Sequence, residues 1–237
     1  MVVLLFMRIA RAFALPFLLF SPFSTGHAQP APNELVLPVR YHHQEHSLSC
    51  EAAALKTVLD YYGMQVTEDE ILKRMPFDTT PHERGIWGDP NVAFVGDVDG
   101  QMGVNGYGIH SQALQRVSSH WRRTALIRGG RVEELTAHLE QRRPVIVWGY
   151  ERNREALRWK TKDGRPVEAI AGEHTRVVYG FKGDARAPAG FYVMDPLSGP
   201  RYWDTRAFLE NWDSLGRTGI VLYEASAGPD KPTSENK

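Results

Sequence analysis

The sequence predicts an α+β domain in which helices come first along the chain and an antiparallel sheet follows. Two observations predict this order. Apolar residues early in the chain recur at the i, i+3, i+4, i+7 spacing of an amphipathic helix, at Leu55, Val58, Leu59 and Tyr62. Later in the chain, continuous apolar β-branched runs such as Pro144–Gly149 are typical of buried strands.

The first predicted helix begins at the only cysteine of the chain, Cys50, and Gly63 supplies its C-terminal stop. Ser47 or Ser49 can act as its N-cap. In a first helical turn, unpaired N–H groups and the positive end of the macrodipole favour a negative side chain. We therefore expect the pKa of the Cys50 thiol to be lowered and the thiol to act as a nucleophile.

The alternative is that Cys50 is a small buried apolar residue, as free cysteines often are. Residues 1–28 weigh against this, because two arginines, the apolar run Ala12–Phe20 and small residues before position 28 are typical of a secretory signal peptide. That run is too short for a membrane span and is broken by Pro16. A lone cysteine in a secreted protein is explained by burial, by pairing with another chain or by use.

The remaining elements follow from the same patterns. A capping box at Thr67–Glu70 predicts a short helix at Ile71–Met75. Further helices are expected at 111–120, 131–141 and 205–212. Strands are expected at 36–41, 124–127, 144–149, 157–161, 166–170, 174–181, 191–194 and 220–223. These bounds predict one domain over 37–225, after a Pro-rich lead-in at 29–36 and before a disordered tail at 226–237.

The stretch Pro76–Ile109 is rich in Gly, Asp and Pro and has no clear periodicity. A connection this long is usually functional or disordered, and its aromatic residues argue for order. We predict an ordered binding loop or lid beside the active site, with Trp87, Tyr107 and His110 as substrate-binding residues. His110 can instead cap the helix that follows it.

Charge and composition exclude several classes of partner. Lysines and arginines balance the acidic residues, and no basic patch is visible, which argues against nucleic acid. After removal of the signal peptide, no apolar run could span a bilayer. His42, His43 and His46 could bind a metal, but clustered loop histidines are more often solvated, and no HExxH or Cys-x-x-Cys motif accompanies them. We expect neither a metal nor a cofactor.

A nucleophilic cysteine needs a base, a group that orients the base and a donor for the oxyanion. His174 opens an apolar strand, and Asp195 ends the next one. If these strands form a hairpin with its loop centred between residues 184 and 185, His174 falls opposite Asp195. Gln44 lies six residues before Cys50 and can turn its amide toward the same point as the Cys50 backbone N–H.

These residues resemble a known family. The ordered set of Gln44-x5-Cys50 at a helix start, Gly-x-His ending at His174 and Asp-Pro beginning at Asp195 is similar to the papain-like cysteine peptidases of the bacteriocin-processing (double-glycine leader) type, and specifically to their free-standing secreted bacterial relatives. The likeness extends over 37–224 through the phrases SCEAAALKTVLDYYG, WGDPN, FVGD, RPVIVWG and GEHTRVVYG. It implies a papain-like fold with Cys50 as nucleophile, His174 as base, Asp195 as orienting group and Gln44 as oxyanion donor.

Two departures from the transporter-fused members of that family matter. Those members have Gly directly after the cysteine, whereas Glu51 stands here, and no transporter segments follow in this sequence. Leader-peptide cleavage is therefore not assumed. Glu51 complements the helix dipole but opposes formation of a thiolate next to it, so the imidazolium of His174 would have to lower the thiol pKa.

The sequence therefore predicts a secreted thiol hydrolase, extracellular or periplasmic, that cleaves a peptide or isopeptide bond of a peptide or protein substrate through an acyl-enzyme. Acyl transfer or amidase chemistry could use the same residues. A second hypothesis is a non-catalytic module that binds a peptide or glycan through the Pro76–Ile109 stretch. A third, weaker one is a metal-dependent protein that uses His42, His43 and His46.

Overall fold

The computed structural model describes residues 34–224. The predicted signal peptide at 1–28, all but the last residues of the lead-in and the tail at 226–237 lie outside this range. Within it the α+β class is confirmed, with helices preceding most of the sheet along the chain. None of the helices between residues 34 and 224 is long and apolar enough to cross a membrane.

The helices are α1 (Cys50–Tyr61), α2 (Glu68–Leu72), α3 (Ser111–Ser118), α4 (Val132–Glu140) and α5 (Thr205–Asp213). The strands are β1 (Glu34–Val36), β2 (Phe77–Asp78), β3 (Phe94–Gly96), β4 (Gly106–Gly108), β5 (Thr124–Ile127), β6 (Val145–Tyr150), β7 (Ala156–Lys160), β8 (Pro166–Ile170), β9 (Glu173–Asp184), β10 (Ala187–Asp195), β11 (Gly199–Asp204) and β12 (Gly219–Leu222). Most elements lie within a few residues of their predicted bounds. The sequence analysis missed β11, and β1 begins and ends earlier than expected.

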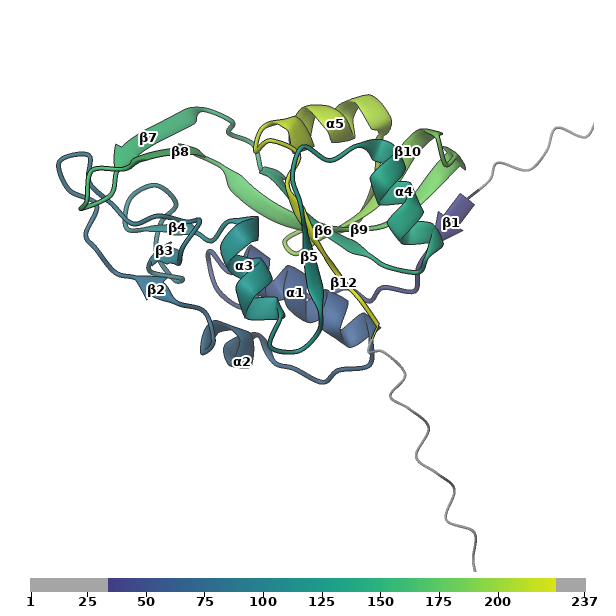
Figure 1. Cartoon of the computed structure of the whole chain (residues 1–237), viewed down its shortest axis with the longest axis horizontal. Coiled ribbons are helices and arrows are strands. Elements are labelled where there is room, and N and C mark those ends of the chain that lie inside the picture. The colour runs from purple at the N-terminus through teal and green to yellow at the C-terminus, as the bar shows by residue number, and fades with distance from the viewer. Residues whose placement is uncertain (1–33, 225–237) are drawn as a thin grey trace, which may run out of the picture. The chain divides into compact units, whose positions relative to one another are not determined.

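The main sheet is antiparallel and has the strand order β11-β10-β9-β6-β12-β5, with β1 added along β9. In Figure 1, α1 and α3 lie on one side of this sheet and α4 and α5 on the other. Helix α1 packs against β9 and β6, and α5 packs against β10, β6 and β11. The apolar stripe of α1 is fully buried, as its spacing predicts, at Leu55, Val58 and Leu59.

The expected hairpin register, with His174 directly opposite Asp195, is wrong by two residues. Met194 pairs with Val177, and the ladder between β9 and β10 is shifted at two irregularities. The next position along this ladder therefore brings Arg176, rather than His174, opposite Asp195. Such bulges insert an extra residue on one strand, and sequence patterns do not reveal them.

The stretch 76–109 is ordered, as predicted. It also contains regular structure that was not predicted, because β2, β3 and β4 form a small three-stranded sheet within it. Strands of two or three residues are too short to show a period. Trp87 and Tyr107 are buried in a second apolar cluster, together with Trp159 and Val167 from the β7–β8 hairpin. The aromatic residues therefore fasten this stretch to that hairpin.

Candidate active site

Cys50 and His174 line one cavity of about 250 Å³. Cys50 is the first residue of α1, and His174 is the second residue of β9. Gln44 and Leu197 also line the cavity, as does Met102 from the stretch between β3 and β4. The structure thus brings together the predicted nucleophile, base and oxyanion donor, which come from segments far apart in the sequence.

The imidazole of His174 is oriented by Asp195. Nε2 of His174 lies 3.2 Å from Oδ1 of Asp195, and both side chains are buried. The same carboxylate oxygen accepts the backbone N–H groups of Leu197 at 2.8 Å and Ser198 at 3.1 Å. Because Nε2 is held by Asp195, Nδ1 is the ring nitrogen left to receive a proton from a thiol.

A buried arginine completes this side of the site. Nε of Arg176 donates to Oδ2 of Asp195 at 2.6 Å, and its NH2 group donates to the carboxylate of Glu151 at 2.6 Å. Burial opposes ionisation of Asp195, but the hydrogen bond and charge of His174 and the charge of Arg176 hold its pKa well below the usual range. Burial lowers the pKa of His174, and the bond to Asp195 acts against this.

The expectation of a lowered thiol pKa at Cys50 is wrong for this structure. Burial raises the pKa of the thiol well above its usual value, and the nearby carboxyl groups of Glu51 and Glu173 raise it further. Only the backbone N–H of Thr175, which hydrogen-bonds to the sulfur, acts in the opposite direction. Sγ donates to Oε2 of Glu51 at 3.4 Å. The helix start is therefore outweighed by burial and by two acidic neighbours.

Ser49 stands at the N-cap position of α1, as one of the two predicted caps, but its side chain does not cap the helix. Its hydroxyl instead donates to the carbonyl of His46 and accepts the His46 N–H. This local turn shapes the loop between Gln44 and Cys50. The loop is further fixed by the bond from Leu48 N–H to the carbonyl of Val98.

Gln44 is buried, and its amide nitrogen donates to the carbonyls of His46 at 2.8 Å and Ser47 at 3.0 Å. Because both acceptors are carbonyl oxygens, the amide NH2 group must face them. The amide oxygen, Oε1, is then buried without a hydrogen-bond partner. The amide would have to release one of these carbonyls before it could donate to an oxyanion. The role of Gln44 as oxyanion donor therefore stays a prediction.

The predicted substrate-binding residues do not line the cavity of Cys50. Trp87 and Tyr107 are fully buried, because they pack in the second apolar cluster. His110 is the N-cap residue of α3 and lines a separate cavity of about 400 Å³, beside Trp148 and Ile170. Of the stretch between residues 76 and 109, it is Met102 that reaches the Cys50 cavity. One residue of the stretch therefore reaches the cavity, whereas Trp87, Tyr107 and His110 lie elsewhere, and a role of these three in substrate binding stays a prediction.

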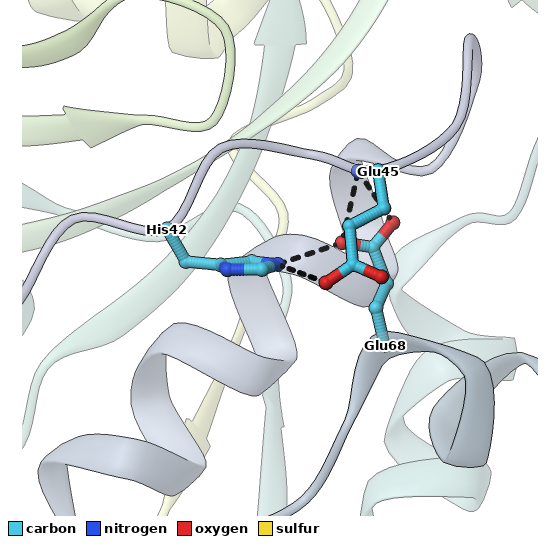
Figure 2. A group of neighbouring side chains, drawn as sticks. All are labelled: His42, Glu45 and Glu68. Carbon is cyan, nitrogen blue, oxygen red and sulfur yellow. Dashed lines mark hydrogen bonds and ion pairs between the residues drawn. The ribbon is translucent and has the colours of Figure 1, made fainter.

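The three clustered histidines point to different partners and do not form the metal site considered from sequence. His42 binds Glu68 at 2.9 Å, His43 binds the hydroxyl of Tyr41, and His46 binds Asp99 at 3.0 Å. Figure 2 shows His42 with Glu45 and Glu68, an imidazole and two carboxylates within 4.8 Å of one another. The carboxylate of Glu68, which is buried, also accepts the backbone N–H of Glu45 at 3.2 Å. These contacts tie the loop before α1 to the first turn of α2.

Sequence reasoning missed the roles of Glu173 and Arg176. Both lie on the phrase Gly172–Val177, and both are buried in the structure. Charged residues inside a strand that is otherwise apolar were the available signal, because they are seldom fully buried unless paired. Alternation along β9 places Glu173 and Arg176 on opposite faces of the sheet, where Glu173 contacts Glu51 of α1 and Arg176 donates to Asp195 of β10.

Comparison with known proteins identifies a family and a fold. The model of the Peptidase_C39 like family matches residues 36–220. The uncharacterized protein YvpB of Bacillus subtilis is 25% identical over 181 residues, which cover 74% of this chain and 69% of that protein. A crystal structure described as a C39-like peptidase from Bacillus anthracis matches 81% of this chain and 98% of its own, with a TM-score of 0.70 and 22% identity. This match shows the papain-like fold that the sequence resemblance implied.

A more distant match is a double glycine motif protease from an AMS/PCAT transporter, solved in complex with its leader peptide. It is 16% identical, covers 80% of this chain and 94% of its own, and has a TM-score of 0.48.

Proposed function

This chain belongs to the Peptidase_C39 like family, and we propose that it is a secreted thiol hydrolase that cleaves a peptide or isopeptide bond. Its family and fold are those of cysteine peptidase-like hydrolases. The observation that carries the proposal is that Cys50 and His174 face one cavity while Asp195 holds the far side of the imidazole. This arrangement supports the roles of Cys50 as nucleophile, His174 as base and Asp195 as orienting group in acyl transfer.

In the proposed reaction, Nδ1 of His174 takes the proton from Sγ of Cys50. The thiolate attacks the carbonyl carbon of the substrate, and its oxygen becomes an oxyanion. The backbone N–H of Cys50, which has no acceptor within α1, is one donor for that oxyanion. The amide of Gln44 becomes the second donor if it turns away from the carbonyls of His46 and Ser47.

Collapse of the tetrahedral intermediate breaks the C–N bond, and the imidazolium of His174 gives its proton to the leaving amine. The product is a thioester on Cys50. Water, deprotonated by His174, then attacks the thioester carbonyl and releases the carboxylic acid and the free thiol. An amine in place of water would give acyl transfer, so hydrolysis and transfer differ only in the second nucleophile.

The test uses the chain that begins at Gln29, incubated with a library of peptides whose new termini are read by mass spectrometry. We expect cleavage by the native protein and a loss of at least about 100-fold in Cys50→Ala and His174→Ala. His120→Ala alters an exposed imidazole outside the cavity and serves as the matched control, with cleavage retained. Cleavage that persists unchanged in Cys50→Ala would refute the proposal.

One observation favours a second candidate, a non-catalytic peptide-binding module. The thiol of Cys50 donates its hydrogen bond to Glu51 instead of His174, and the pKa of this thiol is raised. A native protein that binds peptides of the library but leaves all of them intact would favour this module.

Addition of a free amine to the cleavage reaction separates hydrolysis from acyl transfer, because only transfer yields the amide product.

Secretion is part of the proposal and rests on residues 1–28 of the sequence. We expect the mature protein to begin at Gln29 when the full chain is expressed in a bacterium with a general secretion system. Mass spectrometry of the periplasmic and culture fractions tests this directly. A chain that keeps its first 28 residues and stays in the cytoplasm would contradict it.

A further inference from the structure

Two carboxyl groups lie together beneath the thiol of Cys50. Glu51 follows Cys50 in the first turn of α1, and Glu173 precedes His174 on β9. Oε1 of Glu51 accepts the backbone N–H of Ile109 at 2.6 Å, and Oε2 of Glu51 accepts from Sγ of Cys50 at 3.4 Å. The side chains of Glu51 and Glu173 are themselves in hydrogen-bond contact, and an oxygen of each lies within 4.8 Å of the sulfur.

No cation neutralises this carboxyl pair among the residues that the structure describes. Arg176 is the nearest one, but its donors go to Asp195, Glu151 and the carbonyl of Tyr150. Oε2 of Glu173 is buried and accepts no hydrogen bond. Two buried carboxyl groups in contact cannot both be ionised without a partner charge, so the pair must hold at least one proton.

Gly108 leaves room for the two carboxyl groups because it has no side chain. A Cβ on Gly108 would lie 2.5 Å from Oε1 of Glu51 and 2.8 Å from Oε2 of Glu173. Gly108 also has φ +141°, a conformation that other residues rarely adopt. The chain thus passes close over both carboxyl groups and excludes water from them.

We propose that Glu51 and Glu173 are both protonated in the active form, that Glu51 donates its proton as a hydrogen bond to Sγ when the Cys50 thiolate forms, and that loss of the Glu51 proton, while Glu173 keeps its own, returns the sulfur to the thiol. The inference rests on the proposed role of Cys50 as nucleophile. Glu51 touches the reacting sulfur and would be a catalytic residue, whereas Glu173 acts through Glu51 and would be a positioning residue.

The protons balance without any further reactant. When the thiolate forms, the S–H proton moves to Nδ1 of His174, and the carboxyl proton stays on Oε2 of Glu51, between oxygen and sulfur. When solvent removes the carboxyl proton, the negative charge of Glu51 faces the thiolate. The sulfur then takes its proton back from the imidazolium, which leaves a neutral thiol and a neutral imidazole.

The direction of the pH dependence follows from burial. Burial raises the pKa of Glu51 to about 7, and burial together with the charge of Glu51 raises that of Glu173 well above its usual value. The pair is therefore neutral at lower pH and becomes anionic as pH rises through about 7. The other groups that face it are Tyr107 from β4, whose pKa is raised so that it stays neutral, and the guanidinium of Arg176 from β9.

The thiolate population should therefore fall as pH rises past neutrality, which is opposite to the behaviour of a free thiol. A like charge in contact shifts a pKa by about 1–3 units, so we expect alkylation of Cys50 to slow by at least about tenfold. At still higher pH the thiol ionises by itself and the rate rises again. The native protein should show a dip in alkylation rate on the alkaline side of neutrality.

The test is the rate of Cys50 alkylation by iodoacetamide as a function of pH, in the native protein and in Glu51→Gln. The amide keeps its oxygen on the N–H of Ile109, so its NH2 group faces the sulfur as a donor that never ionises. This variant should lose the dip. A dip that persists in Glu51→Gln, or a native protein whose rate rises steadily with pH, would overturn the proposal.

Two further variants give the matched comparison. Glu173→Leu removes the hydrogen bond by which Glu173 lowers the pKa of Glu51, so the dip should move to higher pH. Glu68→Gln alters an equally buried carboxyl group, which contacts His42 and Glu45 instead of the thiol, and should leave the dip in place. A dip that stays at the same pH in Glu173→Leu, or that moves equally in both variants, would contradict the role of the pair.

A second measurement needs no variant. The infrared C=O band of buried protonated carboxyl groups in the native protein should lose intensity with the same midpoint as the fall in alkylation rate, because Glu51 ionises there while Glu173 keeps its proton. Midpoints more than about one pH unit apart would overturn the proposal, because each unit is a tenfold change in protonation. Neither readout uses a substrate, so peptide cleavage without the dip refutes this inference alone, whereas the dip without cleavage leaves it standing and refutes the hydrolase.

Discussion

Two sites of buried carboxyl groups lie on opposite faces of β9, and the structure places them in opposite electrostatic surroundings. On the face that carries His174 and Arg176, the carboxylate of Asp195 is hydrogen-bonded to both side chains, and its pKa is held well below the usual range. On the face toward α1, Glu51 and Glu173 contact each other without a cation, and both pKa values are raised. Burial is similar at the two sites. Burial raises the pKa at both sites, but at Asp195 the hydrogen bond and charge of His174 and the charge of Arg176 outweigh it, whereas nothing comparable offsets it at Glu51 and Glu173.

The comparison has a chemical consequence for the sulfur between the two sites. An ionised carboxylate suits the task of holding an imidazolium, while a protonated one can act as a hydrogen-bond donor. Alternation of side chains along β9 directs Glu173 to the protonated pair and the next residue, His174, to the ionised carboxylate of Asp195.

The largest effect is expected where the ionised site loses its cation. Arg176→Met leaves Asp195 buried without its guanidinium, and removal of one partner of a buried ion pair costs about 3–5 kcal/mol. Urea unfolding near neutral pH measures this loss. Arg158→Met is the matched control, since its partner Glu168 and Arg158 itself are exposed and their bond of 3.3 Å should contribute about 0–1 kcal/mol. An equal loss of unfolding free energy in both variants would show that the buried ion pair stabilises the protein no more than the exposed one.

A second prediction concerns the base. Asp195→Asn removes the negative charge bonded to Nε2 of His174, so the pKa of the imidazole should fall by about 1–3 units. Titration of the His174 ring C–H signals by NMR measures this shift. Glu151→Gln removes a carboxylate that is half-exposed and reaches the site through Arg176, and a clearly smaller shift is expected. A larger shift in Glu151→Gln would mean that Asp195 is not the orienting group.

The smallest effect is expected where the protonated site loses one hydrogen bond. The hydroxyl of Thr175 donates to Oε1 of Glu173 at 3.3 Å, and this bond lowers the pKa of Glu173. Thr175→Val should reduce the free energy of unfolding by about 0.5–1.5 kcal/mol. It should also raise the pH at which the carboxyl pair ionises, read from the infrared band of the protonated carboxyl groups.

The control for this change is Thr136→Val. The hydroxyl of Thr136 is also buried, but it donates to the neutral carbonyl of Ala185 at 2.7 Å. We expect a similar loss of stability and no change in the ionisation of the carboxyl pair. A shift of the infrared midpoint in Thr136→Val would show that any buried hydroxyl has this effect.

Local sequence signals predicted most elements, because the causes of helices, caps and strands are local. The capping box of α2 formed as expected, with Glu70 N–H bonded to the hydroxyl of Thr67 at 3.2 Å. The stretch 124–127 is a strand at the predicted bounds. Cys50 at a helix start and His174 at a strand start were visible as positions, and their common cavity then followed from the fold.

The sequence by itself determined the α+β class, the helix that begins at Cys50 and the three residues of the proposed triad, since periodicity and caps act over a few residues. Only the tertiary structure decided the register that puts Arg176 opposite Asp195 and the burial of Trp87 and Tyr107. It also brought Glu51 of α1 against Glu173 of β9, more than a hundred residues apart in sequence. The pKa of a buried group depends on neighbours from distant segments, so the protonation state of this site is set by the tertiary structure.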